Sequence, residues 1–519
     1  MPTIPHSDNL LQHLDDSIAV VKKYNGNLLA DPSLLHLQPR VKLSIAGPTS
    51  VFIEAVTKPG DKLAALPETL DGFTLRVRPA TAQELVEGFV PLSAWEGLAL
   101  ETVPPISYVP PPVSLVSLKE QQINTLICHV GPDSGWPTLQ PFLEGTQRTL
   151  TVAMYEFYAS HILDTVTKLG QNPSHQMDMI LQVDKNDKTA EVTLRSTWKN
   201  RLTFVPASVK GPNRIFNNSY HTKVSVRDSS AFWVSSGNWS PASQPTVPPG
   251  MEKTLYSLGN REWHLLIEHK PLAEMYEKFI RYDMEQASHV PPVPAAAPTP
   301  QPDLLVPMEA LFPEAAVEQP HPFLAKKMTF PGAGIRVKPL MSPDNYAQSV
   351  LDLIQGAEHS LYIQFSYINA PFNELFDQII TAITDKMNAV PKIDVKVLVS
   401  RNQKPDSAEV LLTRRDWKAS MFRQQTSRMH NKGILIDGKI VVVGSNNWSS
   451  DGTQYNRDTS LVLFSEDVYR YFEEVFLFDW EHLSKPFGSG SPVVPELAPM
   501  TESTPLGMLR IPYQAWFDE

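Results

Sequence analysis

Two segments of this 519-residue chain, about 210 residues apart, contain the same spaced motif, His-x-Lys-x4-Asp. The motif residues are His221, Lys223 and Asp228 in the first copy and His430, Lys432 and Asp437 in the second. One match of this kind is weak evidence, whereas two matches in equivalent surroundings indicate an internal repeat. Any fold proposed for this chain must therefore place two similar halves.

The residues that follow each motif are duplicated as well. A Ser-x-Asn-Trp segment recurs, and an Asn-Arg-acid segment follows it in both copies. The corresponding residues are Ser236, Asn238, Trp239 and Asn260-Arg261-Glu262 in the first copy, and Ser445, Asn447, Trp448 and Asn456-Arg457-Asp458 in the second. The first copy has 13 additional residues between these segments, mostly PASQPTVPPGMEK, which predict a proline-rich loop beside its motif.

Strand-like and helix-like runs alternate before each motif. They cover residues 149–157, 162–169 and 177–184 in the first half, and 360–368, 374–383 and 392–400 in the second. Strand, helix and strand in succession predict βαβ units and an α/β fold with a mixed or parallel sheet. The motifs also read as strands, so that the histidine and the lysine two positions later share one face. Asp228 and Asp437 fall at turns, which predicts a structural, hydrogen-bonding role for both.

Proline-rich stretches mark the predicted domain boundaries. The chain has 47 prolines, five of them in residues 104–112 and six in residues 291–302. Such stretches favour extended conformations and cannot join a helix interior. The predicted organisation is an N-terminal α/β accessory domain (1–103), a hinge (104–112), a first repeat (113–290), a linker (291–322), a second repeat (323–485) and a C-terminal tail (486–519).

The N-terminal piece contains no catalytic motif. It is expected to begin with an amphipathic helix that places Leu10, Leu11, Leu14, Ile18 and Val21 near helical spacing. Strands are expected at 41–47, 50–56 and 73–80, with a turn at 66–72.

The net charge of −11 argues against a protein that is coated in basic charge for nucleic acid or membrane. Locally the balance differs, because residues 195–223 contain six basic and no acidic residues, and residues 401–432 contain eight basic and three acidic residues. These segments predict either solvated loops or a basic rim that attracts an anionic substrate. The aromatic residues among them are candidates for base stacking or acyl-chain contact; they are Trp198, Phe216, Trp417 and Phe422.

Cysteine content and hydropathy exclude further classes. The single cysteine, Cys128, excludes an intramolecular disulfide framework and a cysteine-rich zinc site, and is expected to be a small buried residue. No run of 18 apolar residues occurs, so no transmembrane helix is predicted. The N-terminal sequence lacks a basic start followed by an apolar core, so the expected location is cytoplasmic.

Over residues 113–485, the duplicated motif set closely resembles the phospholipase D superfamily. The resemblance implies that the two repeats pack with pseudo-twofold symmetry around one active site. It also implies that His221 attacks phosphorus to form a phosphohistidine while His430 acts as general acid and base. Two positions depart from the family pattern: Ser235 replaces a glycine that the second copy retains as Gly444, and Asp458 replaces a glutamate.

Physical chemistry supports roles for the other motif residues. Lys223 and Lys432 would offset the phosphate charge, so that no metal or other cofactor is expected. Glu262 and Asp458 would each accept a hydrogen bond from the far ring nitrogen of a histidine. Hydrogen bonds to phosphate oxygens are expected from Ser236, Asn238, Ser445 and Asn447.

The sequence therefore predicts a metal-independent phosphodiester hydrolase of the phospholipase D type, which acts on phospholipid headgroups and can also transfer them to an alcohol. A nuclease that uses the same site on DNA or RNA is the alternative, and a non-catalytic anion-binding scaffold is a third hypothesis. A monomer suffices for a complete site, because both motifs lie in one chain.

Overall fold

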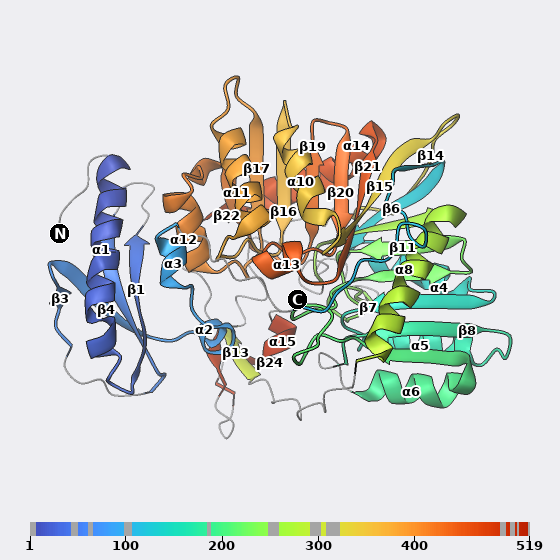
Figure 1. Ribbon diagram of the computed structural model, residues 1–519, viewed down its shortest axis with the longest axis horizontal. Helices are drawn as coiled ribbons and strands as arrows, with labels where there is room; N and C mark the ends of the chain where they lie inside the picture. The colour runs from blue at the N-terminus through green and yellow to red at the C-terminus, as the bar shows by residue number, and fades with distance from the viewer. Residues whose placement is uncertain are drawn as a thin grey trace.

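The computed structural model describes residues 7–42, 50–60, 66–97, 106–183, 188–247, 259–290, 303–307, 322–487, 495–498, 504–505 and 508–516. They form a small N-terminal sheet, two large mixed sheets covered by helices, and a three-stranded sheet. Figure 1 shows the N-terminal sheet at one end of the molecule and the two large sheets side by side at the other. The predicted α/β fold class is confirmed.

The N-terminal sheet has the strand order β1-β2-β4-β3 and packs against one long helix. Its elements are α1 (Ser7–Leu28), β1 (Leu34–Lys42), β2 (Ser50–Thr57), β3 (Thr69–Leu70) and β4 (Phe73–Pro79), followed by α2 (Ala82–Glu87) and α3 (Leu92–Trp95). Leu14, Ile18 and Val21 of α1 are buried as predicted, whereas Leu11 is 41% exposed. The first strand begins earlier than predicted, at Leu34, and residues 43–49 lie outside the described residues.

The first large sheet has the order β14-β6-β12-β11-β10-β7-β8-β9. Its strands are β14 (Lys326–Thr329), β6 (Thr125–Gly131), β12 (Glu262–Glu268), β11 (Ala231–Ser235), β10 (Val224–Arg227), β7 (Thr149–Met154), β8 (Gln176–Leu181) and β9 (Leu202–Pro206). The helices associated with this sheet are α4 (Gly135–Glu144), α5 (Ser160–Gly170), α6 (Lys188–Trp198) and α8 (Lys270–Ser288).

The second large sheet has the order β22-β18-β17-β16-β19-β20-β21-β15-β5. Its strands are β22 (Ser484–Pro486), β18 (Phe422–Gln425), β17 (Asp394–Val399), β16 (Ser360–Phe365), β19 (Lys432–Ile436), β20 (Ile440–Gly444), β21 (Asp458–Phe464), β15 (Ile335–Ser342) and β5 (Gln121–Ile123). Its helices are α10 (Tyr346–Gln355), α11 (Glu374–Met387), α12 (Pro405–Arg414), α13 (Ser450–Gln454) and α14 (Glu466–His482).

Seven consecutive strands have the same order in both sheets. The series β6-β12-β11-β10-β7-β8-β9 corresponds to β15-β21-β20-β19-β16-β17-β18. In each series three strands run parallel, through the pairs β7–β8–β9 and β16–β17–β18, and the others are antiparallel. The connecting helices bury one face: in α11, Phe376, Ile379, Ile380 and Ile383 recur at helical spacing and are fully buried. The strand–helix–strand pattern of both halves is therefore confirmed.

Each half contributes one edge strand to the sheet of the other half. β5, which precedes the first large sheet in sequence, pairs with β15 at the edge of the second. β14, which precedes the second sheet, pairs with β6 at the edge of the first. Hydrogen bonds thus cross the predicted boundaries of the repeats 113–290 and 323–485 in both directions, because an unpaired sheet edge is satisfied by a neighbouring strand wherever it originates.

Two buried arginines also join the halves crosswise. Arg261 binds Asp133 and, from the other half, Asp479 of α14 at 2.9 Å. Arg457 binds Asp344 at 2.7 Å and, from the other half, Asp283 of α8 at 2.9 Å. Both guanidinium groups are 1% exposed or less, so each pair of carboxylates compensates a charge that is cut off from water.

A third sheet forms from segments that were predicted as linker and tail. Its order is β23-β13-β24, with β13 at Asp303–Pro307, β23 at Glu496–Leu497 and β24 at Met508–Pro512, followed by α15 at Tyr513–Trp516. The linker 291–322 therefore contains a strand, which its proline content did not predict. Residues 291–302 and the first part of the hinge, 104–105, lie outside the described residues.

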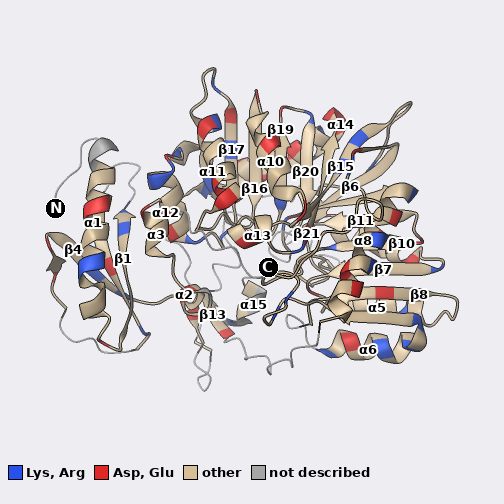
Figure 2. Cartoon of the chain, in the orientation of Figure 1, with Lys and Arg blue, Asp and Glu red and all other residues tan. Residues whose placement is uncertain are grey.

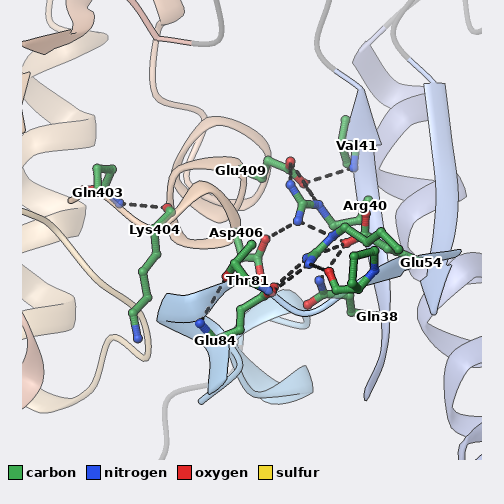
Figure 3. A network of polar contacts seen from close by, with 12 residues as sticks. Gln38, Arg40, Val41, Glu54, Thr81, Glu84, Gln403, Lys404, Asp406 and Glu409 are labelled. Atoms are coloured by element: carbon green, nitrogen blue, oxygen red, sulfur yellow. Dashed lines mark hydrogen bonds and ion pairs between the residues drawn. The ribbon is translucent and has the colours of Figure 1, made fainter. Parts of the chain in front are cut away.

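The N-terminal sheet is attached to the second half by a buried ionic network (Figure 3). Arg40 of β1 donates to Glu409 of α12 at 2.6 Å and also binds Asp406. Glu54 of β2 accepts from Arg78 at 3.0 Å and contributes to the same network. Buried carboxylates and guanidinium groups of this kind require one another, so the network fixes α12 against β1.

No helix among the described residues is long and apolar enough to cross a membrane.

Candidate active site

The two motif histidines lie together between the large sheets. Their ring centroids are 6.3 Å apart with an angle of 73° between the planes, and both residues are at most 3% exposed. Each is fixed by a backbone hydrogen bond from the opposite half: His221 N donates to Arg457 O at 2.7 Å, and His430 N donates to Arg261 O at 3.0 Å. The histidines precede strands β10 and β19 rather than lying within them, which corrects the prediction that the whole motif is strand.

The acids and histidines pair crosswise. Nδ1 of His221 donates to Asp458 Oδ1 at 2.8 Å and also to the carbonyl of Ser445 at 2.9 Å. Nδ1 of His430 donates to Glu262 Oε1 at 2.8 Å. Asp458 and Glu262 are the first residues of β21 and β12, so each strand start delivers its carboxylate to the histidine of the other half. The shorter side chain of Asp458 therefore reaches its histidine as closely as Glu262 does.

These bonds leave the second ring nitrogen of each histidine facing different surroundings. Because Nδ1 donates in both rings, Nε2 carries the lone pair in the neutral form. Nε2 of His221 is buried and has no hydrogen-bond partner among the described residues. Nε2 of His430 lies 2.5 Å from Nζ of Lys432, which donates to it. The lone pair of His221 is thus available, whereas that of His430 is occupied by its neighbouring lysine.

Both lysines are buried beside the histidines. Lys223 Nζ donates to the carbonyl of His221 at 2.7 Å, and Lys432 Nζ donates to the carbonyl of His430 at 2.6 Å. Tyr155 lies against both members of the first motif, 4.7 Å from the ring of His221 and 4.9 Å from the ammonium of Lys223. Burial and the charge of Lys432 hold the pKa of Lys223 well below its ordinary value. An anion bound between the lysines would relieve this cost.

The two carboxylates differ strongly in acidity. Burial raises the pKa of Asp458 to about 7, despite opposing contributions from Lys223 and Ser445. Burial acts on Glu262 in the same direction, but His430, Lys432 and a hydroxyl donor outweigh it and lower the pKa of Glu262 to about 2. At neutral pH Glu262 is therefore ionised, whereas burial favours the protonated form of Asp458.

Hydrogen bonding explains part of this difference. Glu262 accepts hydroxyl hydrogens from Ser236 at 2.5 Å and from Ser243 at 2.9 Å. Asp458 accepts one, from Ser445 at 2.7 Å, and its Oδ2 is buried with no partner among the described residues. The residue that corresponds to Ser243 is Gly452, where a Cβ would lie 2.4 Å from the carbonyl of Asn447. Backbone crowding therefore excludes a serine at the position of Gly452, which is the counterpart of Ser243.

The histidines themselves are neutral in this state. Burial and the charge of Lys432 lower the pKa of His430 to about 4, and burial with both lysines holds the pKa of His221 well below its ordinary value. A phosphate bound between the two lysines would offset their positive charge and would therefore raise the pKa of both histidines.

Ser236 and Ser445, which were predicted to bind phosphate oxygens, are hydrogen-bonded to the two acids in this structure. Each donates its single hydroxyl hydrogen to a carboxylate and accepts from a backbone N–H, that of Trp263 or of Thr459, at 3.0 Å. A hydroxyl has only one hydrogen to donate, so these serines orient the acids instead.

The asparagines have different environments in the two halves. Asn238 donates to Glu156 at 2.9 Å. Asn447 makes no comparable side-chain bond, and its buried Oδ1 has no partner among the described residues. Glu156 is 1% exposed, and its charge raises the pKa of Lys223 against the burial that lowers it. Sequence reasoning missed Glu156, although an acid inside the apolar run 149–157 was a visible signal.

The residue type that fits before each serine depends on the residue that lies opposite it on the neighbouring strand. Gly444 lies opposite Ser460, and a Cβ on Gly444 would lie 1.9 Å from its hydroxyl oxygen. Ser235 lies opposite His264 instead, and its hydroxyl bonds to the ring nitrogen at 2.6 Å and accepts from Gly237 N at 2.7 Å. The departure from glycine is thus accommodated by a different partner.

Asp228 and Asp437 bind backbone at the far ends of the motif strands. Asp228 accepts from three consecutive amides, those of residues 147–149, at 2.7–3.0 Å. Asp437 accepts from the amides of residues 358–360 in the same way. Both have positive φ, 52° and 53°, at the turns between strands. These contacts are those of a structural carboxylate.

The segments before the motifs do not form the predicted aromatic surface. Trp198, Phe216, Trp417 and Phe422 are at most 2% exposed, because their rings pack in the cores beneath the sheets. Several of the basic residues are also bound internally; for example, Arg201 donates to the carbonyls of Gly170 and His175. Figure 2 shows basic and acidic residues intermixed over the outer helices.

Cys128, Trp239 and Trp448 are all fully buried, as expected for core residues. Within the ranges that the structure describes, no group of three or more His, Cys, Asp and Glu side chains is arranged to hold a metal ion.

Residues 350–480 match the family model described as "Cardiolipin synthase, PLD-like domain". This range includes the second motif but not the first. The chain is 34% identical over 61 residues to the mitochondrial cardiolipin hydrolase of Canis lupus familiaris, covering 12% of this chain and 24% of that protein. It is 25% identical over 164 residues to the cardiolipin synthase of Listeria monocytogenes, covering 29% of this chain and 32% of that protein.

The matched segments thus span about a quarter to a third of the length of these relatives. Among solved structures, the phosphatidylserine synthase of Haemophilus influenzae aligns with a TM-score of 0.47 and 13% identity, covering 72% of this chain and 90% of that one. The family match places a phospholipase D-like domain in the second half of the chain, and the duplicated motif agrees with this match.

Proposed function

We propose that this protein transfers a phosphatidyl group, or hydrolyses it, by cleaving a phospholipid phosphodiester through a phosphohistidine. The observation that carries the proposal is the crossed arrangement: two buried histidines face each other, each held by the carboxylate of the opposite half, with a lysine beside each. Such an arrangement supplies a nucleophile, an acid and positive charge around one phosphate.

In the first step, Nε2 of His221 attacks phosphorus and forms an N–P bond. The P–O bond to the leaving alcohol breaks, and its electron pair stays on the oxygen, which takes a proton from Nε2 of His430. Lys223 and Lys432 stabilise the negative charge on the phosphoryl oxygens as the bonds change. The ionised Glu262 stabilises the imidazolium that His430 must be before it donates.

In the second step, the neutral His430 accepts a proton from water or an alcohol as that oxygen attacks phosphorus. The N–P bond breaks, and its electron pair returns to Nε2 of His221. Water gives hydrolysis, whereas an alcohol gives transfer to a new headgroup. The same pair of groups serves both outcomes, and the acceptor that reaches the site determines the product.

The two acids support the order of these roles. A fully ionised carboxylate favours the charged form of its histidine, and a carboxylate near its pKa does so less. His430, paired with Glu262, is therefore suited to the acid and base role. His221, paired with Asp458, stays neutral and keeps an available lone pair on Nε2.

A phospholipid is the favoured substrate because the matched relatives are named for cardiolipin chemistry. The alternative, a nucleic acid, would require a continuous basic and aromatic surface. The aromatic residues predicted for such a surface are instead buried in the cores.

The test is a side-by-side assay with chelator present, on phosphatidylcholine and phosphatidylglycerol vesicles and on single-stranded and double-stranded DNA and RNA. Headgroup release or exchange with glycerol, without cleavage of nucleic acid, is expected. Cleavage of nucleic acid alone would replace the proposal with a nuclease. Full activity after both histidines are changed to alanine would eliminate the mechanism.

A further inference from the structure

Three chain segments that lie outside the two large sheets meet in a small apolar core. Its buried members are Ala82 of α2, Leu304 and Val306 of β13, and Tyr513 and Trp516 of α15. These residues come from the N-terminal piece, the linker and the tail, and none belongs to a catalytic motif. We call this group the accessory cluster; Figure 1 shows its helix α15 near the centre of the molecule.

The accessory cluster rests on Arg401, the second residue after β17. The guanidinium carbon of Arg401 lies 3.7 Å from the ring centroid of Trp516, and Nη2 donates to the carbonyl of Trp516 at 3.3 Å. Gln83 of α2 donates to the carbonyl of Asn402 at 3.4 Å. The tail and the N-terminal piece therefore both contact the loop that begins at Arg401.

This loop is joined to the second motif by two backbone hydrogen bonds. Ser400 N donates to Ser366 O at 3.2 Å, and Ser366 N donates to Asn431 O at 3.0 Å. Asn431 stands between His430 and Lys432 in the sequence. Arg401 is thus the neighbour of Ser400, which is linked to the segment of the second motif through Ser366.

Arg401 differs from the other deeply placed arginines. Arg40, Arg261 and Arg457 are each bound by at least two carboxylates. Within the described ranges, no carboxylate lies within 4.0 Å of Arg401, and its partners are the ring and carbonyl of Trp516. A partly buried guanidinium group without a neighbouring carboxylate can bind an anion, because the free-energy cost of its burial is not yet compensated.

A second arginine strengthens the same local charge. Arg428 lies two residues before His430 and donates to Asn260 at 3.1 Å. Burial first, and then the positive charge of Arg428, lower the pKa of Arg401 to about 9. Both guanidinium groups therefore stand beside the catalytic segment, and their mutual repulsion is relieved by an anion.

We propose that Arg401 is a specificity-determining residue that binds a second phosphate group of the substrate, beyond the phosphodiester that reacts, and that Trp516 covers it until the substrate binds. The inference rests on the proposed function, because the second phosphate is defined relative to the reacting one. The planar fork of an arginine matches phosphate oxygens in pairs. The ring of Trp516 occupies its face and the tail carbonyl occupies one N–H in the absence of that anion.

The experiment compares two short-chain soluble lipids, dihexanoyl phosphatidylglycerol and its glycerol-phosphorylated form, which differ only by a terminal phosphate. The readout is the ratio of kcat/KM for the phosphorylated over the unphosphorylated lipid. We expect Arg401→Gln to lower this ratio about tenfold, the size of one charge-assisted interaction. Trp516→Ala is expected to raise it about threefold, because the cover no longer competes with the phosphate.

Arg423→Gln is the matched control. Arg423 also stacks on a tryptophan, Trp480, at 5.1 Å, and donates to Ser484, but it lies on the edge side of the second sheet next to β22. Its substitution is expected to leave the ratio unchanged. An equal loss for Arg401→Gln and Arg423→Gln, or no change of the ratio with Arg401→Gln, would overturn the proposal.

Binding separates this inference from the proposed function. In a His221→Ala background, equilibrium titration with the two lipids requires no turnover. Tighter binding of the phosphorylated lipid, abolished by Arg401→Gln, supports the anion site even if the wild-type protein turns over neither lipid. Equal affinity for both lipids would refute it, whatever the activity. Thermal unfolding of each variant identifies any that fails to fold.

Discussion

The two halves of the candidate active site contain the same types of residue but differ in their electrostatics. In both halves, the histidine Nδ1 donates to a carboxylate oxygen of the opposite half at 2.8 Å, and a lysine lies beside the histidine. The first histidine faces a carboxylate whose pKa is raised to about 7, and the second faces one whose pKa is lowered to about 2. The backbones of the two halves are therefore nearly symmetric, whereas the two carboxylates differ in their tendency to ionise.

Few residues produce this difference. One is the acid itself, because Asp458 replaces the longer Glu262. Another is the hydroxyl donor Ser243, whose counterpart is Gly452. Among the described residues, Asp458 thus has one hydroxyl donor and a buried oxygen without a hydrogen-bond partner, whereas Glu262 has two hydroxyl donors. The comparison teaches that a duplicated site can assign different roles to its halves through the second layer of contacts.

The largest expected effect comes from the histidines. His221→Ala and His430→Ala should each lower kcat/KM by at least about 10³-fold, because each removes a group that makes or breaks a bond. With a radiolabelled phospholipid, a phosphoenzyme should accumulate in His430→Ala, which lacks the base for the second step, and be absent in His221→Ala. The reverse pattern would exchange the two roles.

The acids should differ in effect. Glu262→Gln is expected to lower kcat/KM by about 10²- to 10³-fold, because His430 loses the anion that stabilises its charged form. Asp458→Asn should cost about tenfold or less, since the amide resembles the protonated acid. A substrate with a nitrophenol leaving group needs little protonation and should shrink the Glu262→Gln defect. Equal losses for both variants on both substrates would remove the proposed asymmetry.

Stability against pH should separate the same two residues. The raised pKa of Asp458 means that the folded state holds its proton more tightly than the unfolded state, so its contribution to stability falls as pH rises from about 4 to 7. Glu262 has a lowered pKa, so its contribution is present above about pH 4.5 and is lost as pH falls toward 2.

Each contribution is on the order of 3–4 kcal/mol. Urea unfolding across this range should show that Asp458→Asn gains stability relative to wild type between pH 4.5 and 7.5. Glu262→Gln should lose its relative disadvantage only in acid. Parallel curves for the two variants would contradict the difference in acidity.

The smallest effect is expected from the motif aspartates, where the two halves are alike. Asp228→Asn and Asp437→Asn should each lower the free energy of unfolding by about 1–2 kcal/mol, because a carboxylate that accepts three amide hydrogens is replaced by a weaker acceptor. The kcat of both variants should stay within about twofold of wild type. A loss comparable to that of Glu262→Gln would place these residues in the catalytic machinery.

Much of the fold was predictable because the relevant signals are local. Apolar runs at 149–157 and 360–368 became β7 and β16, and the helices that follow carry their buried residues at helical spacing. The strand β13 in the proline-rich linker was not predictable, because a five-residue segment becomes a strand only when β24, some 200 residues later, pairs with it.

The site was predictable as a set of residues but not as a set of contacts. Spacing identified the histidines, lysines and acids, since the duplication made chance matches improbable. It could not show that Ser236 and Ser445 donate to the carboxylates, that the charge of Glu156 acts on Lys223, or that Arg401 has no carboxylate within 4.0 Å among the described residues. Those properties depend on partners from distant segments.

The sequence by itself determined that this chain has two copies of the His-x-Lys-x4-Asp motif and the strands beside them, because both depend on residue spacing within each copy. Only the tertiary structure decided which acid holds which histidine. The strand that carries each acid starts against the histidine of the other half, and burial there sets one pKa near 7 and the other near 2. Proximity and desolvation arise only when the two halves pack together, so they cannot be predicted from the sequence of either copy alone.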